Sequence, residues 1–263
     1  MDIGRFRQEL SGLWDEDPVT APHPRDRRFG SVVTDTRGMA TENKLALLNF
    51  ACSFLAEDEA YVEIGTYRGT SVIGAALGNE HRSFVAIDNF SQFGGPEAEC
   101  RENLAKFKCD HVRLINGDAW TVLAQESFPL IGVFFYDGGH TYREQIRAFA
   151  AAAPHLAPEA LVIIDDSSHP PVRAANAITV RSRPDLELLF SFPSPRNTDP
   201  RWWNGIDVFA FRRTASIPVP PPKGVLHRWY SLRYGPAYEF LRAATGQVGR
   251  LFHPLVGGRH DQQ

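Results

Sequence analysis

The stretch AYVEIGTYRGTS, residues Ala60–Ser71, decides how this chain folds. Its first part, Tyr61–Ile64, has the apolar and β-branched character of a short buried strand. Gly65 breaks that strand, and Gly69 opens a predicted helix. A glycine in the turn lets the backbone bend sharply and approach a ligand closely, because it has no Cβ. The helix start presents unpaired N–H groups to that ligand. The stretch therefore predicts the first half of a nucleotide-binding βαβ unit.

The spacing of the glycines argues against a dinucleotide. A dinucleotide site has the pattern G-x-G-x-x-G, in which the middle glycine makes room for a pyrophosphate. Here Tyr67 occupies that position, and the pattern reads Glu63-x-Gly65-x-x-x-Gly69. NAD is therefore not the expected ligand.

Further along the chain, apolar runs end at acidic residues. The predicted strands are Ser83–Ile87, Val112–Asn116, Leu130–Tyr136 and Ala160–Ile164. The acids that follow them are Asp88, Asp118, Asp137, Asp165 and Asp166. Ligands of open α/β sheets bind beyond the carboxyl ends of the strands. We therefore expect these acids to converge on one edge of the sheet, where the ligand binds.

Asp88 is the first of these acids. In a βαβ unit, an acidic residue about 20 positions beyond the glycine turn can bind both ribose hydroxyls. The interval from Gly69 to Asp88 fits, and a carboxylate can accept two hydrogen bonds from a cis-diol. The alternative is that Asp88 only ends its strand.

The chain resembles class I S-adenosylmethionine (SAM) methyltransferases over about 38–211. Its loop matches their motif I in the E-I-G-x-x-x-G-x-S form of the catechol and caffeoyl-CoA O-methyltransferase branch. The resemblance implies an α/β, Rossmann-like class I methyltransferase fold, with a mostly parallel seven-stranded sheet, a closing antiparallel hairpin and helices on both faces. Leu186–Phe192 and Ile206–Phe211 are expected to form that hairpin.

The same resemblance implies which residues contact SAM, which has no phosphate and needs only a cradle for its methionine and ribose. These residues are Glu63, Gly65, Thr66, Tyr67, Gly69, Ser71, Asp88, Asp118 and Asp137. Asp118 would lie against the adenine amino group; the alternative is a helix N-cap. The segment Gly38–Ala40 is either a loop that contacts substrate or SAM, or a plain linker.

Three of the acids suggest a metal. Asp137, Asp165 and Asp166 would repel one another unless a cation, a proton or a basic partner compensates, and hard oxygen ligands select Mg²⁺ or Ca²⁺. The catechol branch uses an Asp, Asp, Asn triad, and macrocin-type macrolide-sugar O-methyltransferases use a similar acidic set. The resemblance implies that these three residues bind Mg²⁺ or a similar divalent cation. The alternative is that some of them cap helices or bind the SAM amine.

A base must take the proton of the acceptor hydroxyl. The catechol branch uses a lysine, but this chain has none between Lys108 and Lys223. Macrolide-sugar enzymes carry D-x-x-H, which the run Asp137–His140 matches, and a neutral histidine can accept a proton at physiological pH. We therefore expect His140, with Asp137, to be catalytic; His169 is the reserve base.

The implied activity is SAM-dependent, divalent-metal-assisted O-methylation of a sugar or another polyhydroxylated small molecule, as in natural-product tailoring. One alternative is an oxidative enzyme like the cephalosporin hydroxylases, which share the fold and the strand-end acids. No convincing 2-His-1-carboxylate iron set is visible in the sequence, which speaks against it. The other alternative is a non-catalytic protein that binds SAM or a nucleoside.

Composition limits partners and compartment. A net charge of −3 argues against nucleic acid as a partner. The three cysteines form neither a CxxC metal site nor an even disulfide set. The first residues lack the apolar core of a signal peptide, and no apolar run approaches the ~20 residues of a membrane span. We expect a cytoplasmic protein.

The chain divides into three parts. Residues 1–40 form a leader, either mobile or a lid over the substrate pocket. Residues 41–213 form the SAM-binding domain, in which Trp202 and Trp203 either stack on the acceptor or pin the hairpin to the core. Residues 214–263 form a proline-rich linker and a basic aromatic extension, a candidate surface for partner docking or homo-oligomer formation.

Overall fold

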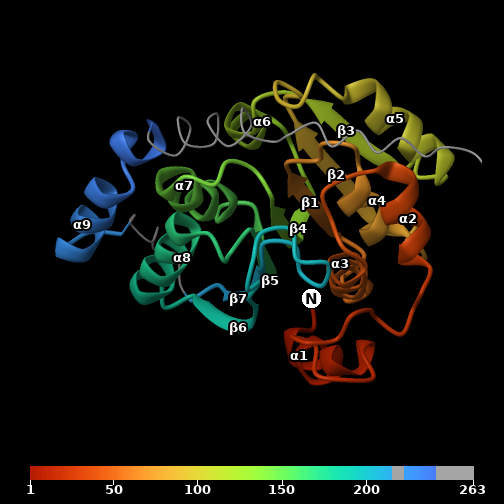
Figure 1. The fold of residues 1–263 in the computed structure, drawn as a ribbon, viewed down its shortest axis with the longest axis horizontal. Coiled ribbons are helices and arrows are strands. Elements are labelled where there is room, and N and C mark those ends of the chain that lie inside the picture. The colour runs from red at the N-terminus through yellow and green to blue at the C-terminus, as the bar shows by residue number, and fades with distance from the viewer. Residues whose placement is uncertain (215–221, 241–263) are drawn as a thin grey trace, which may run out of the picture.

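A computed structural model describes residues 1–214 and 222–240 of the chain. At its centre lies a seven-stranded sheet with the order β3-β2-β1-β4-β5-β7-β6 (Figure 1). The strands are β1 (Glu59–Ile64), β2 (Ser83–Asp88), β3 (Val112–Asn116), β4 (Leu130–Tyr136), β5 (Leu156–Asp165), β6 (Leu186–Phe192) and β7 (Ile206–Arg212). The pairs among β1 to β5 are parallel, and β7 runs antiparallel to both β5 and β6. The predicted sheet with its closing antiparallel hairpin is confirmed.

Helices cover both faces of the sheet. They are α1 (Ile3–Glu9), η1 (Leu10–Leu13, 3₁₀), α2 (Phe29–Thr36), α3 (Glu42–Ser53), α4 (Thr70–Ala76), α5 (Glu97–Lys106), α6 (Ala119–Gln125), α7 (Tyr142–Ala152), α8 (Pro170–Ser182) and α9 (Val225–Arg233). Side chains of α1 to α5 share one core with residues such as Tyr61, while those of α6, α7 and α8 share the other with residues such as Val62. This split follows from the alternation of side chains along a strand.

The leader packs onto the hairpin and α3. Its side chains Phe6 and Trp14 are buried. Trp14 lies 5.6 Å from Trp202 between ring centroids, and Trp202 stacks on Phe192 at 4.2 Å with an interplanar angle of 11°. The Trp202 indole also donates a hydrogen bond of 2.8 Å to the Pro18 carbonyl. Trp202 therefore joins the leader to the hairpin.

Two elements differ from the sequence-based expectation. The leader contains a further helix, α2, which was not predicted. Strand β5 begins at Leu156 rather than at Ala160, because Leu156 and Ala157 are buried and Leu156 pairs with Ile131. The sequence did not predict this start because residue 158 is a proline, and proline inside an apolar run argues against a strand.

The C-terminal part is described only over 222–240. Helix α9 lies beside α7 and α8 (Figure 1), where Tyr230 and Tyr234 pack against a buried cluster that includes Tyr142 and Ile178. Pro218, Pro220, Pro221 and everything after Phe240 lie outside the described residues.

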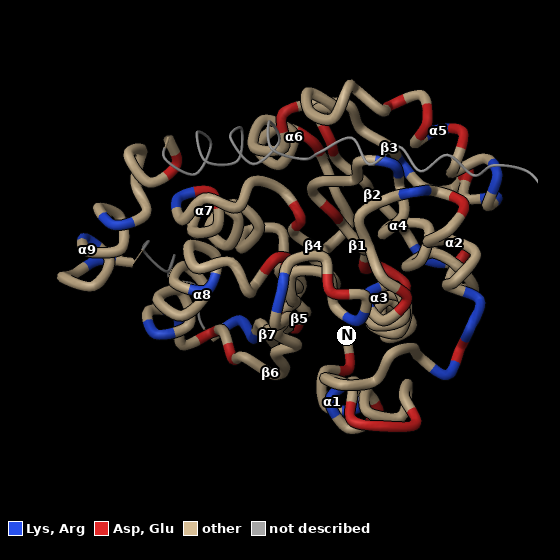
Figure 2. The backbone as a smooth tube through the Cα atoms, in the orientation of Figure 1, with Lys and Arg blue, Asp and Glu red and all other residues tan. Residues whose placement is uncertain are grey.

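Charges of both signs are interspersed along the described backbone (Figure 2). Among the helices that the structure describes, none combines the length and the hydrophobicity that a membrane crossing requires.

Candidate active site

The glycine turn lies against the end of β4. Gly65 has φ +95°, and a Cβ at this position would lie 2.1 Å from the Asp137 carbonyl oxygen. A glycine is therefore required by both the backbone conformation and the close approach. Gly69, at φ +82°, is the N-cap of α4. The local pattern of strand, turn and helix is as the sequence predicts.

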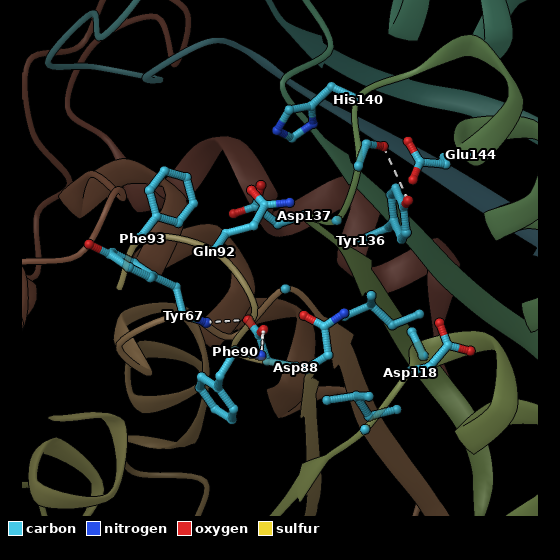
Figure 3. Close-up of a pocket in the computed structure, with 18 of the residues that line it drawn as sticks. Tyr67, Asp88, Phe90, Gln92, Phe93, Asp118, Tyr136, Asp137, His140 and Glu144 are labelled. Carbon is cyan, nitrogen blue, oxygen red and sulfur yellow. Dashed lines mark hydrogen bonds between the residues drawn. The ribbon is translucent and has the colours of Figure 1, made fainter. Parts of the chain in front are cut away.

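Asp88 is held by the turn itself. Its Oδ2 accepts a hydrogen bond of 2.8 Å from the Tyr67 backbone N–H, and its Oδ1 accepts one of 2.7 Å from the Phe90 N–H (Figure 3). These two bonds fix the plane of the carboxylate at the end of β2. Each oxygen keeps a lone pair for a further donor.

A cavity of about 520 Å³ opens beyond the carboxyl ends of β1, β2 and β4. This size is within the range of small-molecule sites. Several of the predicted site residues line it, together with aromatic side chains (Figure 3); among the lining residues are Gly65, Tyr67, Asp88, Phe93, Asp118, Trp120, Tyr136, Asp137 and His140. The convergence of strand-end acids on one edge is thus present in the structure.

Other predicted SAM contacts lie behind the turn. Thr66 and Ser71 border a much smaller adjoining cavity. Glu63 is fully buried and accepts hydrogen bonds from the Tyr61 hydroxyl at 2.6 Å and the Ser71 hydroxyl at 3.2 Å. Burial raises the pKa of Glu63 to about 7, so this carboxyl group is easily protonated near neutral pH. Its partners are residues of the turn region rather than the large cavity.

Asp118 lines the cavity and also caps a helix. It is the N-cap of α6, and its Oδ1 accepts hydrogen bonds from the Thr121 backbone N–H at 2.9 Å and the Thr121 hydroxyl at 2.8 Å. These bonds lower the pKa of Asp118. The capping alternative is therefore realised, and a contact with adenine stays a prediction.

The acidic cluster contains a cation that the sequence analysis missed. Lys44, on α3, extends its Nζ to both carboxylate oxygens of Asp165, at 2.6 Å from Oδ2, and the two side chains are only 1% and 2% exposed. Burial works against the charge of Lys44, but Asp165, Asp137 and Asp166 together raise its pKa. The sequence signal was a lysine between the apolar positions of α3, where a charged residue needs a buried partner.

Asp166 contacts His140, a residue of the cavity lining. Asp166 has φ +55°, and its N–H donates a hydrogen bond of 2.8 Å to Asp165 Oδ1. Its Oδ2 lies 2.9 Å from His140 Nε2 and 3.8 Å from His169 Nδ1. Burial opposes ionisation of Asp166, but the hydrogen bond and charge of His140 hold its pKa below the ordinary value. Burial and its acidic neighbours raise the pKa of Asp137.

His140 therefore forms a dyad with Asp166. The imidazole lies above Asp137 at the rim of the cavity (Figure 3). Its Nδ1 is buried and has no hydrogen-bond partner among the described residues. His169 lies behind it, with ring centroids 5.7 Å apart. The structure brings both predicted bases to one carboxylate.

The donors that could hold a cation differ from the predicted set. Asp137, His140 and Asp166 each offer one ligand atom, and these atoms all lie within 4.8 Å of one another. The sequence analysis expected Asp165 in the place of His140. Asp165 is not available as a metal ligand in the same way, because Lys44 contacts both of its carboxylate oxygens.

Comparisons with known proteins relate part of the chain to methyltransferases. Residues 62–167 match a family model described as a methyltransferase domain. An uncharacterized protein of Acanthamoeba polyphaga mimivirus, R132, is 26% identical over 126 residues, which cover 46% of this chain and 57% of that protein. The chain thus spans little more than half the length of this curated relative.

Solved structures share the fold. The O-methyltransferase TomG of Streptomyces achromogenes, involved in tomaymycin synthesis and solved with SAM, has a TM-score of 0.55 at 18% identity, over 81% of this chain and 100% of that one. An O-methyltransferase of Bacillus cereus, solved with SAH, has a TM-score of 0.54 at 16% identity, over 79% and 97%. Residues 62–167 of this chain therefore match a methyltransferase-domain family model, and the chain has a Rossmann-like class I methyltransferase fold.

Proposed function

We propose that this protein is a SAM-dependent O-methyltransferase that acts on a hydroxyl of a sugar or another polyhydroxylated small molecule, as in natural-product tailoring. The observation that carries this proposal is the His140–Asp166 dyad at the rim of the cavity. A proton acceptor is what the methylation of a weakly acidic hydroxyl requires. The glycine turn and Asp88 line the adjacent cavity, and both suit SAM.

The cavity lining supports SAM as the cofactor. Asp88 presents an oriented carboxylate to a ribose diol, and the rings of Tyr67, Phe93 and Trp120 border the same space, where a planar base can stack. When bound, SAM supplies a methyl group on a positively charged sulfur. Asp88, Asp118 and Asp137 line the same cavity, and their negative charge suits a cationic ligand.

His140 is the proposed base. If its Nε2–H donates to Asp166, the buried and unpartnered Nδ1 is left as the proton acceptor, and the ring must turn to bring it to the acceptor hydroxyl. Asp166 then stabilises the imidazolium that forms, as a buried carboxylate does in other base–acid pairs. With SAM bound, its methyl carbon would pass from the sulfur to the acceptor oxygen and the hydroxyl proton would pass to His140, so that atoms and charge balance.

A metal-assisted form of the same reaction is the second candidate. The grouping of Asp137, His140 and Asp166 favours it. A divalent ion there would lower the pKa of the acceptor hydroxyl. An imidazole with two carboxylates suits a transition metal such as Mn²⁺ better than Mg²⁺. In this form His140 is a ligand, so His169 would be the base.

We place the reaction in the cytoplasm. Cys52, Cys100 and Cys109 are all free and buried, as expected for a protein that does not depend on an oxidising compartment. The acceptor is a small molecule because the base lies at a cavity rather than on an open surface. Homo-oligomer formation through the C-terminal extension stays a prediction.

Isothermal titration of SAM, followed by a transfer assay on a panel of glycosides, tests the proposal. We expect SAM to bind and a labelled methyl group to appear on a hydroxyl. Binding without transfer to any glycoside or polyol would favour the non-catalytic alternative. Failure to bind SAM would contradict the proposal, and spectroscopy on anaerobically iron-loaded protein would then test the oxidative alternative.

A further inference from the structure

Lys44 gives the acidic cluster a positive charge of its own. Its ammonium contacts both oxygens of Asp165 in a setting almost closed to solvent. We infer that the Lys44 ammonium takes the place of a divalent cation in the predicted triad of Asp137, Asp165 and Asp166, so that methyl transfer by the His140–Asp166 dyad needs no metal ion there. This inference rests on the first form of the proposed function.

The helix that carries Lys44 is fixed at its start. Thr41 caps α3 by accepting a hydrogen bond from the Lys44 backbone N–H, and its hydroxyl donates a bond of 2.8 Å to the Arg201 carbonyl. The Lys44 side chain therefore approaches the sheet edge from a held position rather than from a loop. Such a charge is pre-organised and does not depend on the concentration of an ion.

Because Lys44 occupies both oxygens of Asp165, this residue has none to offer a metal. A dication in a triad of Asp137, Asp165 and Asp166 would need an oxygen of Asp165, and both already accept from Lys44. It would also have to lie close to the ammonium, and like charges repel strongly in a buried site. The lysine and a metal in the predicted triad therefore exclude each other.

Lys44 acts on the base indirectly, through contacts of Asp165 and Asp166. Asp165 Oδ1 also accepts the N–H of Asp166, whose backbone lies in the left-handed region. This bond directs the Asp166 carboxylate toward His140. Lys44 is thus a positioning residue: it holds Asp165, which orients Asp166, which orients the base.

The test compares wild type with Lys44→Met, which keeps the length of the side chain and removes its charge. Lys106→Met is the matched control, because Lys106 makes an ion pair with Asp35 that is largely exposed. Mn²⁺ alone is titrated into each protein by isothermal calorimetry, and thermal melting is followed with Mn²⁺ and with EDTA. Transfer is measured in parallel under both conditions.

We expect wild type and Lys106→Met to bind no Mn²⁺ with a Kd below about 1 mM and to transfer equally well in EDTA. Lys44→Met frees Asp165, so we expect it to bind Mn²⁺ and to melt higher in its presence. Its transfer should fall about 10²-fold in EDTA, as misplacement of a catalytic group does, and recover in part with Mn²⁺. Mn²⁺ binding or EDTA-sensitive transfer in the wild type would overturn the inference.

Two further points keep the test decisive. If Lys44→Met does not fold, the double variant Lys44→Met/Asp165→Asn removes both members of the pair, and it should fold and fail to gain Mn²⁺ binding, whereas tight Mn²⁺ binding by it would overturn the inference. If no acceptor is found although SAM binds, the proposed function fails on its own. The Mn²⁺ titrations of wild type and Lys44→Met then still decide whether the lysine replaces a metal.

Discussion

Nε2 of His140 lies 2.9 Å from Oδ2 of Asp166, although the two residues follow different strands of the sheet. The Asp137–His140 run comes directly after β4 and Asp166 directly after β5, and these strands are parallel neighbours. Parallel pairing therefore brings a histidine and a carboxylate to one edge. The contact orients the imidazole at the cavity rim, which makes His140 the residue to test first.

Replacing His140 by Ala should lower the transfer rate by about 10²–10⁴-fold, because the acceptor hydroxyl then loses its base. The affinity for SAM should change by less than about threefold, since the proposed cofactor contacts lie on the glycine turn and Asp88. Single-turnover transfer and calorimetric titration measure the two effects. A loss below about tenfold would remove His140 from this role.

The matched control for this variant is His169→Ala. His169 Nδ1 lies 3.8 Å from Asp166 Oδ2, beyond normal hydrogen-bonding distance. We expect its replacement to cost less than about tenfold in rate. A larger loss than that of His140→Ala would assign the proton to His169 and favour the metal-assisted form.

Asp88→Asn should weaken SAM binding by about 10–100-fold. The amide cannot accept from both the backbone N–H groups and a ribose diol, and hydrogen bonds to charged groups contribute about 1.5–3 kcal/mol. Asp118→Asn should change the affinity less than about threefold, because an asparagine caps a helix about as well as an aspartate. Calorimetric titration of SAM compares the two. Equal losses would show that Asp118 binds the cofactor as strongly as Asp88.

Local patterns explain why most of the fold could be predicted. Each parallel strand is a short apolar run, and a turn residue or an acid that follows it in the sequence marks its end. The strands, the glycine turn and the strand-end acids can therefore be predicted from local sequence. The hairpin of β6 and β7 follows from alternation in two neighbouring segments. The edge at which the acids meet then follows from parallel topology alone.

The contacts of Lys44 could not be predicted in this way. Lys44 and Asp165 are 121 positions apart, and no local rule says which strand end a side chain of α3 will reach. The packing of Trp202 on Trp14 is of the same kind, because it joins the leader to the far hairpin.

Trp202→Phe should lower the free energy of unfolding by about 1–3 kcal/mol, because the Pro18 carbonyl loses its donor and a cavity is left beside Phe192. Urea denaturation measures this. Trp203→Phe is the control and should cost less than about 1 kcal/mol, since Trp203 is only partly buried. If the two variants are equally stable, Trp202 does not fasten the leader.

Glu63→Gln should change how stability depends on pH. In the folded state burial raises the pKa of Glu63 to about 7, while Tyr61, Thr66 and Ser71 partly offset this by hydrogen bonding and the charge of Asp88 adds to it. Between about pH 4.5 and 7 the folded state therefore holds a proton that the unfolded state releases. The stabilisation is complete below the unfolded pKa and is lost as the pH rises through 7.

Glutamine has the same shape and does not titrate. The stability of Glu63→Gln minus that of wild type should therefore rise by about 2.5 kcal/mol from pH 5 to pH 8, at about 1.4 kcal/mol per pKa unit. Urea denaturation at several pH values measures the difference, in which the other titrating groups cancel. Glu80→Gln is the control: hydrogen bonds from the Gly78 and Glu80 backbone N–H groups lower the pKa of Glu80 from its ordinary 4.5, so its difference should stay nearly flat from pH 5 to pH 8 and change only at lower pH. A flat difference for Glu63→Gln would mean that Glu63 is ionised throughout this range, and that the turn tolerates a buried negative charge beside its ligand.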